Sequence, residues 1–559
     1  MRSALFLLCA GALCSRLAAQ APAAYDVVIS GGRIVDGSGN PWFYGDVAIA
    51  GDRIVRIATP HALDSAAAKL KIDARGMIIA PGFIDIQGQS RGALLTGDGR
   101  LISKVTQGIT TEIMGEGSTN APANQRTLAA EPDDSSRAIN GHFTGPHGFR
   151  DWLEAMQQHS ASPNFGSFVG ATTLRIYGKG MAQGTPSPAE LDEMRGAMKR
   201  AMEDGAFGLA SALIYPPGEY TTTNELIELA KVMSPYGGVY ITHMRSEADR
   251  LLEAIDEAIE IGRKGGVPVE IYHLKAAGQT NWPKMAQAIA KIDQARRSGL
   301  DVGADMYPYV AGGTGLAVCL PPWVSADGKL FDNLKDPAAR TKMHAEMLAP
   351  ARDWENLCQQ ATPEGVLITQ TRSENQQYQG KRLSEIARMM HKDWAEAAMD
   401  LIASEHRRVE TMFFVASEDN LKLQLRQPWI KFGTDASGLD PSTARGLAHP
   451  RSYGNFPRVL GKYVREEHVI ALEDAIRKMT SSVANRLSLH DRGLLKEGMF
   501  ADIVIFDPQT VADRATYEQP HQLSVGIRDV FVNGVAVVRN GEHTGAKPGR
   551  IVWGPGRRP

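Results

Sequence analysis

YITHMRSE (Tyr240–Glu247) and EIYHLKAAG (Glu270–Gly278) are the two stretches of sequence that decide the fold. Each places a histidine, His243 or His273, at the end of a short apolar run. Short β-rich runs of this kind predict buried parallel strands. In an α/β barrel, imidazoles at the C-terminal ends of neighbouring strands can present a metal ion to a substrate. One histidine alone is more often a hydrogen-bonded core residue, but this pair, with acidic residues before and after it, indicates a metal-dependent hydrolase.

Outward from these stretches, β-rich runs alternate with helical patterns such as NELIELAKVM (Asn224–Met233) and LLEAIDEAIEIGRK (Leu251–Lys264). This alternation predicts an α/β protein with a (β/α)8 TIM barrel. The alternation stops between about residues 310 and 363, which predicts an inserted lid or small subdomain. Candidate strands end near Gln87, Glu116, Gly170, Ser211, His243, His273, Tyr307, Thr371, Ser417 and Asp435, more than the eight that a closed barrel needs.

Both ends of the chain have a different, β-like texture. YDVVISGGRIVDG (25–37) and IRDVFVNGVAVVRNGE (527–542) alternate apolar and polar residues around glycine turns. We therefore expect a small β-sandwich domain composed of residues 21–80 and 486–559. The metal-dependent barrel domain would then span residues 81–485.

The composition narrows the possible partners and the location. With 61 basic and 63 acidic residues the net charge is −2, which argues against nucleic acid or an anionic membrane as a partner.

Residues 1–20 are typical of a signal peptide, with Arg2 before an apolar run from Ala4 to Cys14. That run is too short to span a bilayer. We expect a periplasmic or secreted protein, free of the membrane after signal removal; a retained anchor is the alternative.

Two cysteines, Cys319 and Cys358, remain once Cys9 and Cys14 leave with the signal peptide. The expected compartment permits disulfides. The sequence leaves a Cys319–Cys358 bridge and two buried thiols equally open.

The segment IIAPGFIDIQGQS (Ile78–Ser90) resembles the PGFID-x-H-x-H signature that opens the barrel in the amidohydrolase superfamily. More specifically, the chain resembles the N-acyl-D-amino-acid deacylase (D-aminoacylase) branch. The resemblance implies zinc-dependent hydrolysis of the amide bond of N-acyl amino acids, of D configuration, to a carboxylate and a free amino acid. Further matching segments are GITTEIMGEGSTNAP (Gly108–Pro122), GLASALIYPPGEY (Gly208–Tyr220), DMYPY (Asp305–Tyr309), IKFGTDASG (Ile430–Gly438), HPRSYGNFPRVLGKYVRE (His449–Glu466) and NRLSLHDRGLLKEGMFADIVIFDP (Asn485–Pro508).

The resemblance implies the metal ligands Glu116, His243 and His273. Zinc hydrolases need about three protein ligands and an open position, where bound water reaches a pKa near 7. Asp435 matches the aspartate of the last barrel strand, which takes a proton from the attacking water and returns it to the leaving amine. The alternatives are a surface or capping role for Glu116 and a helix N-cap for Asp435.

Gln87 and Gln89 depart from the resembling pattern, because the superfamily usually has two histidines there. A neutral amide is a poor zinc ligand compared with imidazole. We therefore expect one zinc ion, with the two glutamines forming hydrogen bonds near the water or the substrate. The competing interpretation is a catalytically silent binding protein on the same fold.

The expected small-molecule substrate, an N-acyl amino acid, carries a carboxylate, which favours an arginine fork or a tyrosine hydroxyl. Lys275 is expected near the ligands or the substrate carboxylate, because residues two apart on a strand share a face. Another amide, dipeptide or cyclic-amide hydrolase of the superfamily is the alternative, since the surrounding pocket decides the substrate. The candidate substrate-binding residues are Gln87, Gln89, Tyr215, Arg245, Lys275, Tyr307, Arg372, His449 and Arg451, each with a structural role as its alternative.

Overall fold

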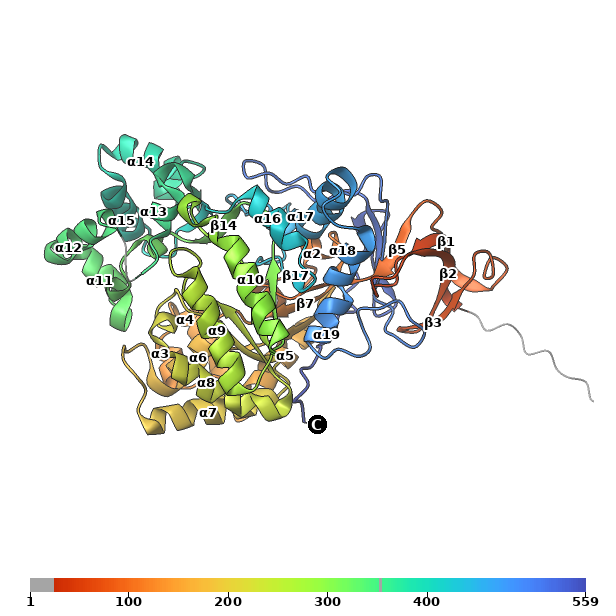
Figure 1. Ribbon diagram of the computed structural model, residues 1–559, viewed down its shortest axis with the longest axis horizontal. Helices are drawn as coiled ribbons and strands as arrows, with labels where there is room; N and C mark the ends of the chain where they lie inside the picture. Colours follow the sequence, from red (N-terminus) through yellow and green to blue (C-terminus); the bar gives the residue numbers. More distant parts are fainter. Residues whose placement is uncertain (1–24, 351–353, 559) are drawn as a thin grey trace, which may run out of the picture.

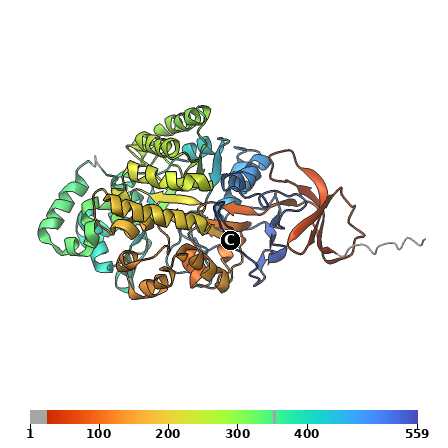
Figure 2. The same ribbon diagram turned by 90° about the horizontal axis from the view of Figure 1, so that it is seen from below.

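The computed structural model describes residues 25–350 and 354–558. Parallel strands and their helices form the body of an α/β structure (Figure 1). Figure 2 shows a β-rich unit and a helical segment at opposite ends of the long axis. The predicted signal peptide, residues 1–20, lies outside the described residues. Of the helices in the described part of the chain, none is long and apolar enough to cross a membrane.

The central strands run parallel in two sheets, with the orders β6-β7-β8 and β17-β13-β12-β11-β10-β9. Phe168 alone separates β8 from β9, and a parallel bridge joins Gly88, after β6, to Ala436, after β17. The strands are β6 (Phe83–Asp85), β7 (Ile109–Met114), β8 (Asn164–Ser167), β9 (Val169–Gly170), β10 (Gly208–Ala212), β11 (Val239–His243), β12 (Val269–Ile271), β13 (Val302–Met306) and β17 (Ile430–Phe432).

Every residue of β11 and β12 is buried, as expected for parallel strands covered on both faces. His243 is the last residue of β11, and His273 follows β12 by two positions. Because parallel strands end at the same edge, the two imidazoles meet there.

Amphipathic helices cover the parallel strands. Helix α9 (Leu251–Gly265) buries Leu251, Ile255 and Ile259, which lie four residues apart and so share one face. It stops before Gly266, whose φ of 69° is a left-handed conformation common after helix ends. The other helices of this layer include α5 (Gly148–His159), α6 (Ala171–Lys179), α7 (Pro188–Glu203), α8 (Thr223–Met233), α10 (Lys284–Arg297), α16 (Glu418–Leu425), α18 (Leu472–Met479) and α19 (Ser481–Arg486).

The inserted segment extends beyond the predicted residues 310–363. Its antiparallel sheet has the order β14-β16-β15, so the strands predicted to end near Thr371 and Ser417 pair here and not with the parallel strands. A separate apolar core consists of buried residues between Leu316 and Val415 together with Ala248 and Ala277. A disulfide joins Cys319 to Cys358, which decides between the two open alternatives. The elements are β14 (Ala311–Gly315), α11 (Leu330–Lys335), α12 (Pro337–Leu348), α13 (Leu357–Ala361), β15 (Val366–Gln370), α14 (Leu383–Met390), α15 (Trp394–Glu405) and β16 (Glu410–Phe414).

Both ends of the described chain enter one nine-stranded sheet. Strand β5 connects the two ends, because it pairs in parallel with β1 and antiparallel with β18. The order is β21-β20-β19-β18-β5-β1-β2-β3, with β4 beside β1. The strands are β1 (Tyr25–Ile34), β2 (Phe43–Ala50), β3 (Arg53–Ala58), β4 (Ala68–Asp73), β5 (Ile78–Pro81), β18 (Ile503–Phe506), β19 (Ile527–Val532), β20 (Val535–Arg539) and β21 (Glu542–His543).

Candidate metal centre

Glu116 reaches the carboxyl edge of the parallel strands through a turn that only glycine accommodates. Gly115, directly after β7, has a φ of 112°. A Cβ atom at this position would lie 2.4 Å from the carbonyl oxygen of Phe168. The absence of a side chain at residue 115 therefore lets the chain turn so that Glu116 faces the two histidines.

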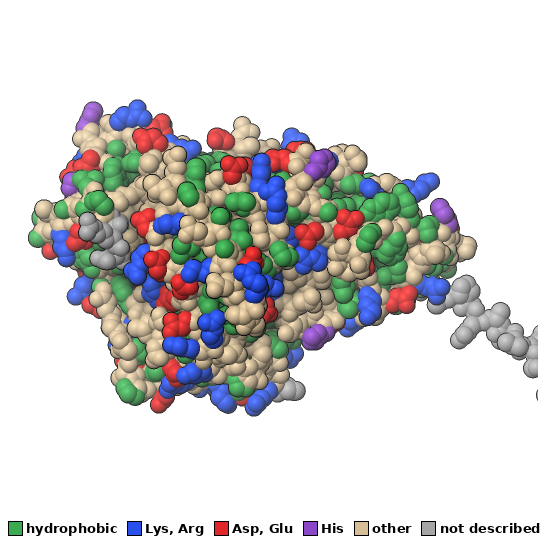
Figure 3. All heavy atoms as spheres, viewed as in Figure 1, with side chains coloured by type: hydrophobic (Ala, Val, Ile, Leu, Met, Phe, Trp, Pro, Cys, Tyr) green, Lys and Arg blue, Asp and Glu red, His purple; other side chains and the backbone are tan. Residues whose placement is uncertain are grey.

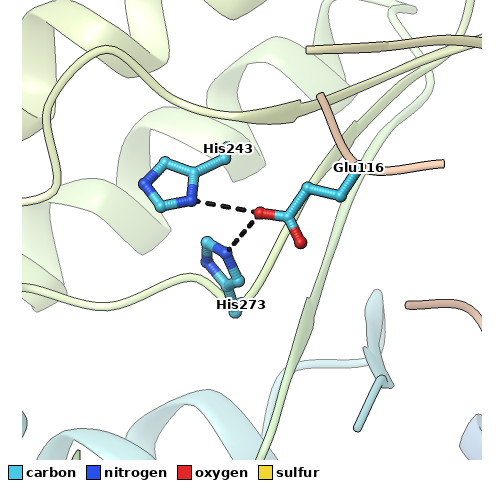
Figure 4. Close-up of side chains that lie close together, drawn as sticks. All are labelled: Glu116, His243 and His273. Atoms are coloured by element: carbon cyan, nitrogen blue, oxygen red, sulfur yellow. Dashed lines mark hydrogen bonds and ion pairs between the residues drawn. The ribbon is translucent and has the colours of Figure 1, made fainter. Parts of the chain in front are cut away.

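The side chains of Glu116, His243 and His273 converge on one point (Figure 4). Oε1 of Glu116 lies 3.2 Å from Nδ1 of His243 and 3.2 Å from Nε2 of His273. One ligand atom from each residue lies within 4.8 Å of the other two. A carboxylate and two imidazoles at this spacing form a donor set that suits zinc.

The electrostatics of this cluster also fit a cation. Burial alone would raise the pKa of Glu116, but hydrogen bonds to His243 and His273 outweigh burial and hold that pKa well below its usual value. Glu116 is therefore a carboxylate, the form that binds metal. His273 has a left-handed backbone, with a φ of 33°, a strained conformation that is concentrated at functional sites.

Glu247 and Lys275 contact Nδ1 of His273, on the side of the ring opposite to Glu116. Nδ1 of His273 lies 2.8 Å from Nζ of Lys275 and 3.0 Å from Oε1 of Glu247. A proton on Nδ1 that is donated to Glu247 leaves the Nε2 lone pair free to face Glu116 and a metal ion. His243 presents Nδ1 instead, and its Nε2 is buried without a hydrogen-bond partner among the described residues.

Gln87 and Gln89 contact the other oxygen of Glu116. Their Nε2 atoms donate to Oε2 of Glu116 at 2.7 and 2.8 Å. Gly88 between them is tightly packed, since a Cβ there would lie 2.0 Å from Cγ of the buried Glu112. Because both hydrogen bonds are donated by amide nitrogens, the two glutamines orient the Glu116 carboxylate.

Asp435 lies beside the cluster, between an amide and a guanidinium. Gln89 donates to its Oδ1 at 3.3 Å, and NH1 of Arg451 lies 2.8 Å from its Oδ2. Burial raises the pKa of Asp435, and the charge of Arg451 opposes that rise. Its φ of 48° is again left-handed. Asp435 is thus a buried carboxylate with a strained backbone, as is common for catalytic groups.

His449 and Tyr307 support Arg451. The guanidinium of Arg451 lies 4.5 Å from the centre of the Tyr307 ring, a cation–π contact. Burial and the nearby Arg451 charge lower the pKa of His449 well below its usual value, so this imidazole is neutral. It donates from Nε2 to the carbonyl oxygen of Ala311 at 2.9 Å and accepts the backbone N–H of Arg451 on Nδ1 at 3.1 Å.

These groups open into a cavity of about 780 Å³. The antiparallel sheet of the inserted segment lines part of this cavity, including Gly313, Thr369 and Met412. The predicted residues on its wall are Gln89, Glu116, Tyr215, His243, His273, Lys275, Tyr307, Asp435, His449 and Arg451. Gln87 is buried behind them, in contact with Glu116.

Besides the buried Gln87, two predicted substrate-binding residues lie outside this cavity. Arg372 is exposed, because β15 belongs to the inserted sheet and not to the parallel strands. Arg245 lines a neighbouring cavity of about 500 Å³. Its guanidinium binds Glu257 at 2.9 and 3.0 Å and the carbonyl oxygen of Thr221 at 2.7 Å, so the protein itself occupies its donors.

Sequence reasoning missed Glu247 and Arg91, which both line the main cavity. Glu247 is part of the YITHMRSE stretch, four residues after His243, so its position was a usable signal. Arg91 directly follows the segment Ile78–Ser90, which contains Gln87 and Gln89. Nothing in the sequence around it predicted that a charged substrate group would bind there.

Comparisons with known proteins agree with this geometry. The sequence profile described as "Amidohydrolase family" matches residues 71–538. D-aminoacylase of Alcaligenes xylosoxydans xylosoxydans is 32% identical over 529 residues, which cover 94% of this chain and 97% of that protein.

Two solved structures share the fold along nearly the whole chain. N-acyl-D-glutamate deacylase of Bordetella bronchiseptica, complexed with zinc and a phosphonate mimic of the tetrahedral intermediate, has a TM-score of 0.78 and 31% identity, covering 95% of this chain and 100% of that one. A D-aminoacylase with a binuclear metal centre, described by one-metal activation and second-metal attenuation, has a TM-score of 0.76 and 31% identity, covering 94% and 99%. This chain belongs to the amidohydrolase family.

Proposed function

We propose that this amidohydrolase cleaves the amide bond of N-acyl-D-amino acids, releasing a carboxylate and a free amino acid. The observation that carries the proposal is the convergence of Glu116, His243 and His273 beside Asp435 in one cavity. The activities named for the D-aminoacylase and the N-acyl-D-glutamate deacylase, which match this chain along nearly its full length, support the same reaction.

We propose one zinc ion, held by Glu116, His243 and His273. A zinc ion supplies Lewis acidity toward the acyl carbonyl and lowers the pKa of water to about 7. The orientation of Gln87 and Gln89 supports a single site, because both direct amide N–H groups at Glu116 and so do not act as ligands. The one-metal activation described for the related D-aminoacylase is in line with this proposal.

Asp435 is proposed as the group that moves the proton. Its Oδ1 faces Gln89 and its Oδ2 faces Arg451, so the carboxylate is held in place beside Glu116. Burial raises its pKa, which makes it a better proton acceptor than an ordinary aspartate. In the proposed reaction Asp435 accepts a proton from the attacking water and delivers it to the nitrogen of the leaving amine.

The substrate carboxylate is proposed to bind near Tyr307. Lys275 and Arg451 both lie against this ring, at 5.7 and 4.5 Å from its centre. Together they bring two cations and a hydroxyl to one part of the cavity wall, a combination that recognises carboxylates. His449, Gln89 and Tyr215 would shape the same cavity without carrying charge.

We also propose that the two parallel sheets form one closed (β/α)8 barrel. The single residue between β8 and β9 and the bridge from Gly88 to Ala436 support closure at the two seams. A periplasmic or secreted location is proposed as well, and the Cys319–Cys358 disulfide supports an oxidising compartment.

The proposal is tested by metal analysis and turnover on one preparation. We expect about one zinc per chain, loss of activity on chelation, and recovery with one equivalent of zinc. A panel of N-acetyl-D- and N-acetyl-L-amino acids should give turnover with the D series. No metal and no turnover under zinc-replete conditions would contradict the proposal and favour a silent binding protein.

A further inference from the structure

Arg91 is a cation of the cavity wall without an acidic partner in the described part of the chain. Its NH1 donates to the carbonyl oxygen of Ser118 at 2.7 Å. Ser118 is two residues after Glu116, so this hydrogen bond holds the guanidinium near the metal ligands. Glu131 and Glu116 act on it only through longer-range attraction. Burial lowers the pKa of Arg91, so this charge is poorly solvated and gains from a nearby anion.

The remaining donors of Arg91 are available to a ligand. A guanidinium has five N–H donors, and Ser118 accepts from only one of its nitrogens. No atom of Arg91 is among the buried side-chain atoms of the described residues that lack a partner. Arg91 also lines the cavity, so its guanidinium borders the space that a substrate would occupy.

The other cations of the wall are already paired, apart from one at the exposed rim. Lys275 binds Glu247 at 2.7 Å, Arg451 binds Asp435 at 2.8 Å, and Arg408 binds Glu410 at 3.0 Å. Arg445 has no carboxylate within 4.0 Å among the described residues, but its side chain is exposed, so water solvates it. Arg91 is therefore the part-buried cation of this wall that has no carboxylate partner among the described residues, and it is separate from Lys275 and Arg451, which are proposed above to bind the amino acid's own carboxylate.

We infer that Arg91 binds a second carboxylate on the substrate, so that the preferred N-acyl-D-amino acid is a dianion. This inference rests on the proposed deacylase activity and narrows its substrate class. The first carboxylate is that of the amino acid itself. The second belongs either to an acidic side chain or to a dicarboxylic acyl group, and both present the planar acceptor pair that an arginine fork recognises.

Two isosteric substrate pairs separate these sources. N-acetyl-D-glutamate is compared with N-acetyl-D-glutamine, and N-succinyl-D-alanine with its terminal monoamide. The measured quantity is the ratio of kcat/KM for the acid to kcat/KM for the amide in each pair. For the zinc-loaded wild type we expect a ratio of about 10 to 100 in one pair, the value of a charged hydrogen bond.

Arg91→Gln should bring that ratio close to one, whereas Arg91→Lys should retain part of it because the charge remains. Arg445→Gln is the matched control, an unpaired arginine of the same cavity that water solvates, and should keep the wild-type ratio. A merely structural role of Arg91 predicts equal losses for acid and amide.

Equal losses, or a wild-type ratio near one in both pairs, would overturn the inference and leave the deacylase proposal intact. The wild-type ratio requires no variant, so it decides even where a substitution prevents folding. Hydrolysis of none of the four compounds would contradict the deacylase proposal itself, and the inference with it.

Discussion

Both oxygens of the Glu247 carboxylate accept hydrogen bonds from the ammonium group of Lys275, at 2.7 and 2.8 Å. The same carboxylate lies 3.0 Å from Nδ1 of His273 and 3.8 Å from Nε2 of His243. One buried acid thus lies behind both imidazoles, on the side away from Glu116. For His273, whose Nδ1 is within hydrogen-bonding distance of Glu247, this acceptor selects the tautomer in which Nε2 is free to bind a metal ion.

Glu247→Gln should weaken zinc binding about 10- to 100-fold, because carboxylates behind ligating histidines contribute on that scale. The measurement is competition against a chelator of known affinity, read as zinc retained per chain. Glu260→Gln is the control, since Glu260 forms an exposed ion pair with Lys264 on α9. Unchanged zinc affinity in the Glu247 variant would show that Lys275 and the fold suffice to orient His273.

Asp435→Asn should fold and bind zinc but lose turnover by about 10²–10⁴-fold, the range for loss of a positioned proton-transfer group. Asparagine keeps the size of the side chain and its contact with Gln89 but cannot accept a proton. The check is kcat on an N-acetyl-D-amino acid, together with zinc content and circular dichroism. Full activity would refute the role assigned to Asp435.

Glu219 should make the protein less stable as the pH rises. Burial raises its pKa to about 7, with partial opposition from Arg245. Because the folded pKa exceeds that of the unfolded chain, the folded state binds more protons between about pH 4.5 and 7. The free energy of unfolding therefore falls through that window and stays lower above it.

Glu219→Gln should remove this dependence and stabilise the protein by about 1–3 kcal/mol near pH 8, since each pKa unit corresponds to about 1.4 kcal/mol. Urea unfolding of both proteins at several pH values measures the difference. Glu228→Gln serves as the control, because hydrogen bonds from Lys231 and Arg195 lower the pKa of Glu228. Parallel pH profiles for wild type and Glu219→Gln would contradict the expectation.

The Cys319–Cys358 disulfide should stabilise the inserted segment. It closes a loop between residues 39 apart, and a bridge of this length is worth about 2–4 kcal/mol through the entropy of the unfolded chain. The double variant Cys319→Ser, Cys358→Ser should show faster amide hydrogen exchange from Leu316 to Val415 and retain its zinc. Exchange at wild-type rates in that segment would mean that its apolar core alone maintains the structure.

Much of the site was predictable because its residues occupy the ends of regular strands. The apolar runs before His243 and His273 predicted buried parallel strands, and the structure brings both imidazoles to Glu116. The structure places Arg245 and Arg372 outside the main cavity, because proximity to a motif does not fix where a long side chain points. Arg245 turns to Glu257, and Arg372 follows a strand of the inserted sheet.

The sequence by itself determined the alternation of strands and helices, the β-like ends and the residues able to bind a metal, because periodicity and residue chemistry are local properties. Only the tertiary structure decided that Cys319 and Cys358 are bridged, that Glu247 lies behind both histidines, and that Arg91 has no acidic partner in the described part of the chain. Each of these is a distance between atoms far apart along the chain, and such distances are set by how strands, helices and the inserted segment pack together.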